Sequence, residues 1–356
     1  MLYSYCRNFT KKILKQLVYK KEYRPLVIKN QNLIKRNIFN VVGKGNLNPD
    51  KVFYVIQRYP GTGLFSNLAF VINHIKVATD MGFIPIVDMK NFPSIYSEKN
   101  KILCTNNSWE YYFNQITNYT LEEVYKSKNI ILTNNIFYAG NGFNYRITES
   151  DTLLDIFKKN IFLKKTKLKT INYLKKKLLS NKKTLGIHFR GTGYKIEDNP
   201  LTINQMINKI NNILSEEKYD QIFLVTEDSI NFKGIIDYFG SKVIYLKTSQ
   251  RGKTNLEVWN KYPRTRHRYK MGREILYETY LLSYCDGYFD IDTNPKQFVL
   301  ALNLNSNQKR YTVDNKVNKR WKIFNWLRYT WYIKNFLPEE LGGFKNNKKP
   351  KRSIYK

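Results

Sequence analysis

The chain has 356 residues, 42% of them apolar and 15% aromatic, which suffices for a large buried core and about two domains of roughly 150 residues each. This composition excludes an intrinsically disordered protein, because disordered chains contain few aromatic residues. Only three cysteines are present, which excludes a disulfide-rich scaffold, and no Cys or His pair has the spacing of a zinc site. The sequence therefore predicts a two-domain α/β enzyme of a reducing compartment or a large basic binding protein.

Positive charge is concentrated at both ends of the chain. Sixty-one Lys and Arg residues against 28 Asp and Glu residues give a net charge of +33. Residues 1–50 hold eleven basic and two acidic residues, and residues 319–356 hold the same numbers. We therefore expect a basic N-terminal extension over 1–50 and a basic aromatic tail over 319–356. Both suit an anionic surface, either a membrane or a nucleic acid.

The tail alternates Trp and Tyr with Lys and Arg, a pattern typical of the headgroup layer of a bilayer; the alternative is the core of an ordinary terminal helix. No apolar run approaches the ~18 residues of a transmembrane helix. The N-terminus has neither the continuous apolar region nor the cleavage site of a signal peptide. We expect a cytoplasmic protein with peripheral membrane contact.

Hydrophobic patterns in the first half predict strands separated by helices. Residues 90–118, rich in Asn, Tyr, Ser and Trp, indicate an irregular surface segment. Residues 151–179 indicate helices that link the two halves. The remaining predicted elements are strands at 52–57, 84–87 and 129–132 and a helix at 66–81.

The second half alternates strands and helices more regularly. Strands are predicted at 184–189, 222–225, 242–246 and 287–291, helices at 202–217, 229–239, 272–284 and 295–302, and a basic loop at 247–270. This alternation implies parallel sheets covered on both faces. We expect two Rossmann-like domains facing a central cleft, at residues 51–180 and 181–318, with ligands at the carboxyl ends of the strands.

A glycine-containing loop, Pro60-Gly61-Thr62-Gly63, lies between the first predicted strand and helix. Glycines let the backbone approach a ligand closely, and the amides of a helix N-terminus attract anions. The loop lacks a full GxGxxG pattern and a Walker lysine, so a plain turn is the alternative.

The strongest motif is the run GIHFRGTGY, from Gly186 to Tyr194. His188 and Arg190 are two residues apart at the end of a buried strand, so both project to the same side of the sheet. An arginine at the carboxyl end of a parallel strand is well placed to bind a phosphate through its two-pronged guanidinium. The alternatives are a satisfied semi-buried histidine and a structural ion pair. We favour an anion-binding site.

Two acidic motifs follow later strands. Glu227 and Asp228 end the strand at 222–225, where Asp228 is alternatively a helix N-cap. The run from Asp290 to Pro295 leads from a strand into a helix with proline in its first turn, a second candidate for phosphates. Asp290 and Asp292 have the spacing that holds Mg²⁺ or Mn²⁺ on a nucleotide sugar, although this spacing is common by chance.

The run PRTRHRYK, from Pro263 to Lys270, concentrates positive charge in one loop. Such a loop could close over phosphates or over an acidic acceptor. A solvated run of charges is the alternative.

Four segments together resemble the GDP-fucose-using glycosyltransferases of the GT-B fold, in particular the α-1,6-fucosyltransferase group with its nodulation-factor and bacterial relatives. They are PGTGLFSNLAFVINHIKVATDMG, GIHFRGTGY, VTED and YLLSYCDGYFDIDTNPKQFVLALN. The resemblance covers residues 50–305 and implies a GT-B enzyme that transfers fucose from GDP-fucose to a surface glycan or oligosaccharide with inversion. It implies no cofactor beyond the nucleotide-sugar donor and no metal.

The resemblance also assigns roles to individual residues. It implies that His188 touches the guanosine part of the donor and that Arg190 binds the β-phosphate and stabilises it as the leaving group. Gly61 and Gly63 match the glycine loop next to the diphosphate. Glu278 stands where the family has a carboxylate that accepts from guanine N1–H and N2–H.

Further matches lie near the ends of later strands. Thr293 and Asn294 stand where the family has two serines that donate to the β-phosphate. Glu227 and Asp228 match its acidic pair. Gly193 departs from the pattern, since the family has an aspartate there, and this departure bears on activity and donor sugar.

Three questions stay open at the level of sequence. A general base has to be a carboxylate or a histidine near the acceptor hydroxyl, and Asp88, Glu98 and Glu227 are candidates. A metal-dependent glycosyltransferase using Asp290 and Asp292 is one rival function. The other is a basic nucleic-acid-binding protein, for which no RRM, KH, helix-turn-helix or zinc-finger motif is found.

Overall fold

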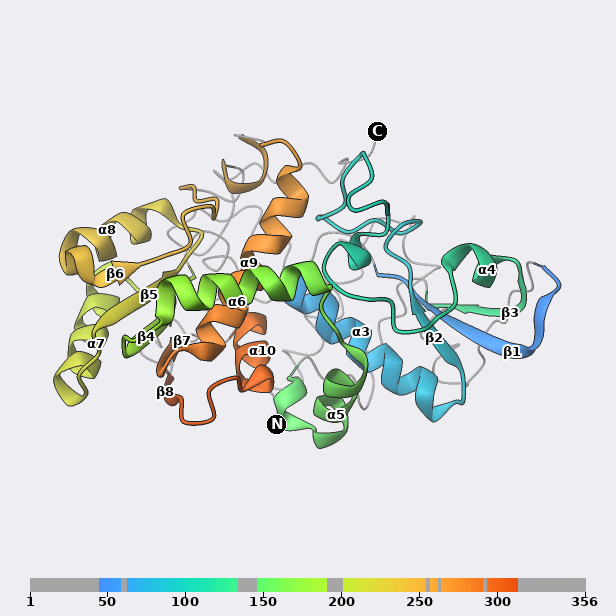
Figure 1. Ribbon diagram of the computed structural model, residues 1–356, viewed down its shortest axis with the longest axis horizontal. Helices are drawn as coiled ribbons and strands as arrows, with labels where there is room; N and C mark the ends of the chain where they lie inside the picture. Colours follow the sequence, from blue (N-terminus) through green and yellow to red (C-terminus); the bar gives the residue numbers. More distant parts are fainter. Residues whose placement is uncertain are drawn as a thin grey trace, which may run out of the picture.

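The computed structural model describes residues 45–58, 63–133, 146–190, 201–253, 257–261, 264–290 and 293–312. Two lobes lie side by side along the long axis, each built on a parallel sheet (Figure 1). The predicted α/β class with two Rossmann-like domains is thereby confirmed. The tail over 319–356 and all but six residues of the segment 1–50 lie outside the described residues, so their membrane contact stays a prediction.

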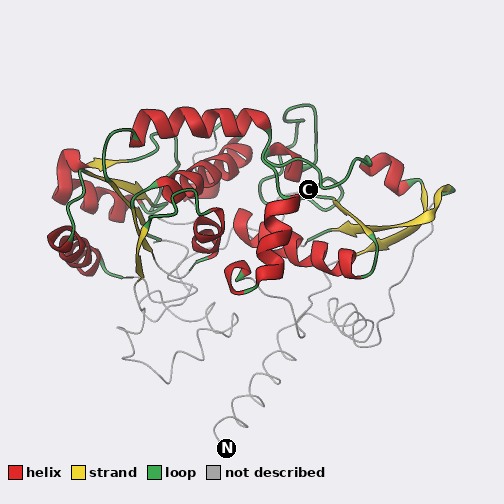
Figure 2. Ribbon diagram, turned by 60° about the horizontal axis from the view of Figure 1, so that its bottom comes forward, coloured by secondary structure: helices red, strands yellow, loops and turns green. Residues whose placement is uncertain are grey.

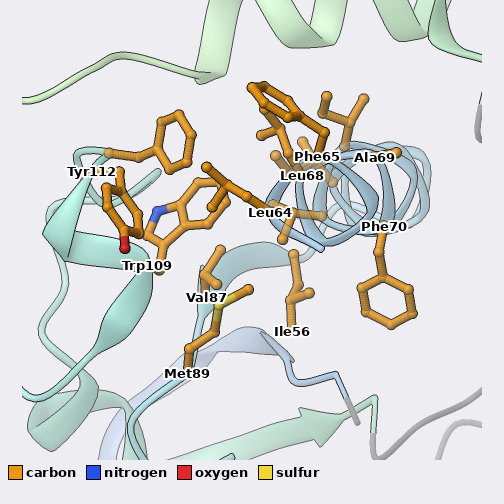
Figure 3. Close-up of a cluster of buried hydrophobic side chains, with 14 of the residues drawn as sticks. Ile56, Leu64, Phe65, Leu68, Ala69, Phe70, Val87, Met89, Trp109 and Tyr112 are labelled. Carbon is orange, nitrogen blue, oxygen red and sulfur yellow. The ribbon is translucent and has the colours of Figure 1, made fainter. Parts of the chain in front are cut away.

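The N-terminal lobe contains a three-stranded sheet in the order β2-β1-β3, with β1 at Leu47–Ile56, β2 at Ile84–Val87 and β3 at Ser127–Leu132. Both neighbours pair with β1 in parallel. Alternate β1 side chains face opposite sides because successive side chains in a strand point to opposite faces. Tyr54 and Ile56 join the core around α3 (Leu64–Asp80), and Phe53 and Val55 join the core around α4 (Leu121–Tyr125). Figure 3 shows the α3 side, where Leu64 lies on the side of the helix toward Val87 and Leu68 lies beside Phe65.

The C-terminal lobe contains a five-stranded sheet in the order β6-β5-β4-β7-β8, parallel throughout. Its strands are β4 (Thr184–His188), β5 (Gln221–Val225), β6 (Val243–Ile244), β7 (Gly287–Asp290) and β8 (Lys309–Thr312). The chain first adds strands on one side of β4 and then on the other. The carboxyl ends of β4 and β7 therefore form the switch point at which ligands of such sheets bind.

Helices cover both faces of this sheet (Figure 2). On one face, α7 (Ile203–Glu216) and α8 (Ser229–Phe239) pack on β4 and β5. On the other lie α6 (Lys165–Leu179), α9 (His267–Tyr284) and α10 (Asn294–Leu302). A capping box of Thr202 and Gln205 starts α7, in which each side chain bonds the other's backbone amide.

One hydrophobic cluster contains side chains of both lobes. Tyr269, Leu276 and Phe298, from α9 and α10, lie in the same buried cluster as the α3 side chains of the N-terminal lobe. The Tyr112 hydroxyl donates to the Tyr269 carbonyl at 2.9 Å. Helix α5 (Asp151–Asn160) and α6 carry the chain between the lobes, as predicted for 151–179.

Most predicted elements are confirmed within a few residues, but two expectations were wrong and two short elements were missed. Residues 90–118 form mainly irregular structure, yet they are not a surface segment, because Tyr96, Trp109 and Tyr112 are at most 5% exposed. The basic loop ends earlier than predicted, since α9 begins at His267 and a π-helical turn covers Glu257–Lys261. The short elements α4 and β8 were missed.

Among the described residues, no helix has both the length and the apolar character needed to cross a bilayer.

Candidate functional site

The carboxyl end of β4 places His188 beside the N-terminus of α10. The imidazole is 2% exposed, and its Nδ1 lies 3.4 Å from the hydroxyl of Thr293, the residue that precedes α10. Burial first and the charge of Arg190 second lower the pKa of His188 to about 3. His188 is therefore an uncharged hydrogen-bonding group at neutral pH.

Arg190 follows two residues after His188 and is half-buried. Its positive charge acts on groups of both lobes: it contributes to the lowered pKa of His188, and it lowers the pKa of Tyr96 in the N-terminal lobe. Burial outweighs that second effect and raises the pKa of Tyr96 to about 12. Arg190 thus follows the carboxyl end of β4, where the C-terminal sheet has its switch point, and its charge acts on a side chain of the N-terminal lobe.

The N-terminus of α10 contributes a second anion-attracting group. Thr293 has an extended backbone, its side chain does not cap the helix, and a proline follows Asn294 in the first turn. The amides of such an end carry partial positive charge. Asp290 pairs in register with His188, but its side chain and the whole of Asp292 lie outside the described residues, as do residues 191–200. No group of three metal-binding side chains gathers among the described residues.

The N-terminus of α3 lies on the facing side, in the N-terminal lobe. Gly63 precedes the helix without a side-chain cap, and the amide of Leu64 donates to the Tyr96 hydroxyl at 2.9 Å. The same hydroxyl that accepts from the first amide of α3 is thus close enough to Arg190 for that charge to lower its pKa. Gly61 lies outside the described residues.

A second polar cluster lies around Glu278 on α9. The carboxyl is 5% exposed and accepts a hydrogen bond from the Ser249 hydroxyl. Burial is the main cause that raises the pKa of Glu278 to about 7; Arg251 and Ser249 oppose the rise, while Glu274 and Glu227 add to it. The charge of Glu227 therefore acts on Glu278, although these two predicted site residues come from different elements.

Asp228 has the structural role that the alternative interpretation predicted. Its Oδ1 accepts from the amides of Ile230 and Asn231 at 2.8 and 3.0 Å, which caps α8. The carbonyl of Glu227 accepts from the amide of Gly252 at 3.0 Å. The pair therefore fixes the loop that follows β5 next to the Glu278 cluster.

Two of the three arginines in the basic loop are held by polar contacts, whereas Arg266 is exposed. Arg264 makes a two-pronged salt bridge with Glu274, at 2.7 and 2.9 Å, whose side chain is 4% exposed. Arg268 donates to the Ile95 carbonyl in the other lobe at 3.2 Å. These two arginines support the loop and the lobe junction, and Pro263 lies outside the described residues.

Two of the three general-base candidates have structural roles. Asp88 is fully buried and accepts five hydrogen bonds, from the side chains of Gln57, Asn91 and Tyr125 and from the amides of Lys90 and Asn91. Glu98 accepts from the Tyr269 amide at 3.0 Å, in the first turn of α9. Both contacts argue against a proton-transfer role for these carboxylates.

A cavity of about 600 Å³ opens at the carboxyl edge of the N-terminal sheet. Its walls combine the rings of Phe92 and Tyr125 with the amide side chains of Gln57 and Asn91. The Asp88 carboxyl accepts from the NH₂ groups of Gln57 and Asn91, which fixes the orientation of both amides beside the cavity. The other lining residues are Lys90, Leu121, Glu122, Lys126 and Leu132.

Sequence reasoning missed Tyr96, Ser249 and Arg251. Tyr96 lies in the segment taken for surface, and its burial depends on contacts with α9 and Trp259 that no local pattern encodes. Ser249 and Arg251 follow β6 in a polar stretch where loop composition gave no signal. Arg251 stacks over the rings of Phe232 and Tyr245, at 4.1 and 5.1 Å from their centroids.

The fold and the site define a two-lobed α/β protein with a polar, cationic switch point. No protein-family model matches the chain. No curated protein matches it either.

Solved structures are similar in fold. Fucosyltransferase NodZ from Bradyrhizobium is 14% identical over 70% of this chain and 92% of its own, with a TM-score of 0.47. Arabidopsis thaliana FUT1 in complex with GDP is 12% identical over 87% of this chain and 78% of its own, with a TM-score of 0.40. POFUT1 in its apo form is 8% identical over 74% and 98%, with a TM-score of 0.38.

Proposed function

We propose that the protein is a glycosyltransferase that uses a GDP-sugar, with GDP-fucose as the donor. The observation that carries the proposal is the convergence of Arg190, neutral His188 and the α10 N-terminus at the switch point between β4 and β7. A cation, a neutral hydrogen-bonding group and helix amides suit a diphosphate rather than an apolar ligand.

Arg190 acts on the leaving group in this proposal. When the bond between the anomeric carbon and the β-phosphate oxygen breaks, negative charge grows on the departing diphosphate. A fixed guanidinium and the partial positive charge of α10 stabilise that charge more in the transition state than in the ground state, which is the condition for catalysis. Thr293 and Asn294, at the start of the same helix, are proposed donors to the β-phosphate.

Glu278 is the proposed partner of the guanine base. A carboxylate accepts both the N1–H and the N2–H of guanine, whereas uracil and adenine present no matching pair of donors. Ser249 fixes one carboxyl oxygen, and Arg251 supplies a charge that favours the ionised form. This chemistry favours GDP over UDP donors.

The acceptor is proposed to be a glycan bound in the cavity of the N-terminal lobe. Aromatic rings beside oriented amide oxygens suit a sugar, which stacks its C–H face on a ring and donates its hydroxyls to acceptors. Transfer then requires an acceptor hydroxyl aligned behind the anomeric carbon, and this in-line attack inverts its configuration.

We propose that the reaction needs no divalent metal, because Arg190 and the helix end can neutralise the diphosphate. This proposal is tested by measuring nucleotide release from the donor in the presence of EDTA. Undiminished activity is expected, and a loss that Mn²⁺ or Mg²⁺ restores would favour the alternative role of Asp290 and Asp292.

A nucleotide-sugar panel tests the function as a whole. The purified protein is incubated with GDP-fucose, GDP-mannose, UDP-glucose or UDP-N-acetylglucosamine, and the released nucleotide is measured. We expect release from GDP-fucose above the other donors. Release from UDP-sugars alone, or from none of the four, would overturn the proposal, and preference for GDP-mannose would assign a different sugar at Gly193.

A further inference from the structure

The segment around α6 carries a concentration of positive charge. Residues 156–183 contain eleven lysines and no Asp, Glu or Arg. Nine of these lysines are exposed: Lys158, Lys159, Lys165, Lys169, Lys175, Lys176, Lys177, Lys182 and Lys183. The comparable helix α7 contains a single lysine, Lys209, so the concentration is local rather than a uniform property of the composition.

Part of this charge lies on one face of the helix. Ile171 is buried against α9, whereas Lys165, Lys169 and Lys176 fall on the opposite side at helical spacing. Beside them, Phe162 is 54% and Tyr173 is 61% exposed. Figure 1 shows α6 at the front of the molecule, running from the C-terminal lobe toward the middle.

This arrangement works against the stability of α6. The N-cap is Lys164, which makes no side-chain cap, and the first turn has cations rather than the acidic residues that the helix dipole favours. Lys165 and Lys169 are four apart and repel each other. In the described chain, the salt bridges of this region involve Lys159 and Lys183 near its ends, not the lysines of α6. Lys167, Lys175 and Lys177 lie over tyrosine rings, whereas Lys165, Lys169 and Lys176 make no ion pair or ring contact among the described residues. Like charges that repel on this face without such a contact indicate an external partner.

We propose that the exposed face of α6 docks on a membrane surface that contains anionic phospholipids. Lysines attract the phosphate groups, and Phe162 and Tyr173 insert into the headgroup layer, where amphipathic rings are favoured. Lysine in place of arginine favours diffuse attraction to a lipid surface over the two-pronged contacts typical of nucleic acids.

Vesicle co-sedimentation of the full chain tests this surface. The wild-type protein, Lys165→Glu/Lys169→Glu/Lys176→Glu and the control Lys128→Glu/Lys218→Glu/Lys233→Glu are mixed with vesicles of pure phosphatidylcholine or with 30% phosphatidylglycerol added. The control removes the same charge from exposed lysines elsewhere. We expect wild type and control to bind the anionic vesicles only, and the α6 variant to bind them at least tenfold more weakly.

A charge-preserving variant separates docking from net charge and from misfolding. Phe162→Ser/Tyr173→Ser is expected to lose binding to anionic vesicles while its circular dichroism spectrum and its vesicle-free GDP affinity stay those of the wild type. Equal losses in the α6 and control triple variants would overturn the proposal, because only net charge would then matter. Tighter binding of single-stranded RNA than of vesicles, lost in the α6 variant, would overturn it in favour of a nucleic-acid surface.

Discussion

Glu278 is the residue whose chemistry departs furthest from that of a structural carboxyl. It is buried, its pKa is raised to about 7, and the Ser249 hydroxyl and Arg251 are its polar surroundings. A buried carboxyl with so high a pKa lowers stability at neutral pH and is typical of functional sites. Glu274, one helical turn away, is instead neutralised by Arg264.

Replacing Glu278 with glutamine should raise stability and abolish GDP binding. The folded pKa exceeds the usual 4.5, so the folded state binds more protons than the unfolded state between about pH 4.5 and 7, and wild-type stability falls as the pH rises through that window. Above pH 7 we expect Glu278→Gln to be more stable by up to about 3 kcal/mol. Urea unfolding at pH 5 and pH 8 measures the difference.

The matched control for this experiment is Glu274→Gln, which should destabilise at both pH values by about 1–3 kcal/mol, because it leaves Arg264 without its partner. Wild-type GDP affinity should rise between pH 6 and 8 as Glu278 ionises. An unchanged affinity in Glu278→Gln would remove this residue from the base-binding site.

At the scale of elements, β4 needs close packing against α9. A Cβ at Gly186 would lie 2.9 Å from Leu282 Cδ2 and 3.0 Å from Cys285 Sγ. Gly186 has the same orientation in the strand as His188, so this contact sets the distance between α9 and the strand that presents the site.

Gly186→Ala should therefore destabilise by about 1–3 kcal/mol, the range for overpacking a well-filled core. Gly63→Ala is the control for space, since the nearest atom to its Cβ would be the Tyr96 hydroxyl oxygen at 3.9 Å, and its loss of stability should stay below about 1 kcal/mol, the cost of alanine at a helix N-cap. Thermal unfolding measures both. Equal effects would show that space at Gly186 is not what constrains the sheet.

Strands and long helices were predictable because their signal is local. The helix at 229–239 and the strand at 84–87 have the predicted bounds, since apolar periodicity and the Asp228 cap mark them. Helix α4 and strand β8 were missed because five and four residues are too short for a periodic signal. Residues 90–118 have the composition of a loop, and their burial comes from contacts with distant α9.

The whole molecule depends on how α9 joins the two lobes. Gly272 lies in α9 where the rings of Tyr112 and Tyr96 approach, and a Cβ there would be 2.6 Å from Tyr112 Cζ and 2.8 Å from Tyr96 Cδ1. Glu98 and Arg268 add hydrogen bonds across the same junction. Tyr96 also accepts from the first amide of α3, so a shift here would reach the site.

Gly272→Ala should destabilise by at least about 2 kcal/mol and weaken GDP binding as well, because it forces the lobes apart. Unfolding energies of Gly272→Ala, Tyr112→Ala and the double variant form the test. Since the residues touch, the double variant should lose less than the sum of the single losses. Strict additivity would contradict a contact between them.

At this scale the sequence indicated two domains and the switch-point motif. Alternating strand and helix patterns predict the domains, and glycines that follow a buried strand mark the motif. It did not indicate that Tyr96 and Arg190 share one electrostatic environment, since that proximity arises only when the lobes assemble. The sequence also did not indicate that Asp88 and Arg264 have structural roles, because their hydrogen-bond partners come from other elements.

The most direct test of the account is GDP binding to Arg190→Ala by isothermal titration calorimetry, with Arg310→Ala as a surface control. A charge-assisted phosphate contact contributes roughly 1.5–3 kcal/mol, so we expect the affinity of Arg190→Ala to fall at least tenfold and Arg190→Lys to fall in between. The affinity of Arg310→Ala should equal that of the wild type. Wild-type affinity in Arg190→Ala would contradict the claim that a diphosphate binds at the end of β4.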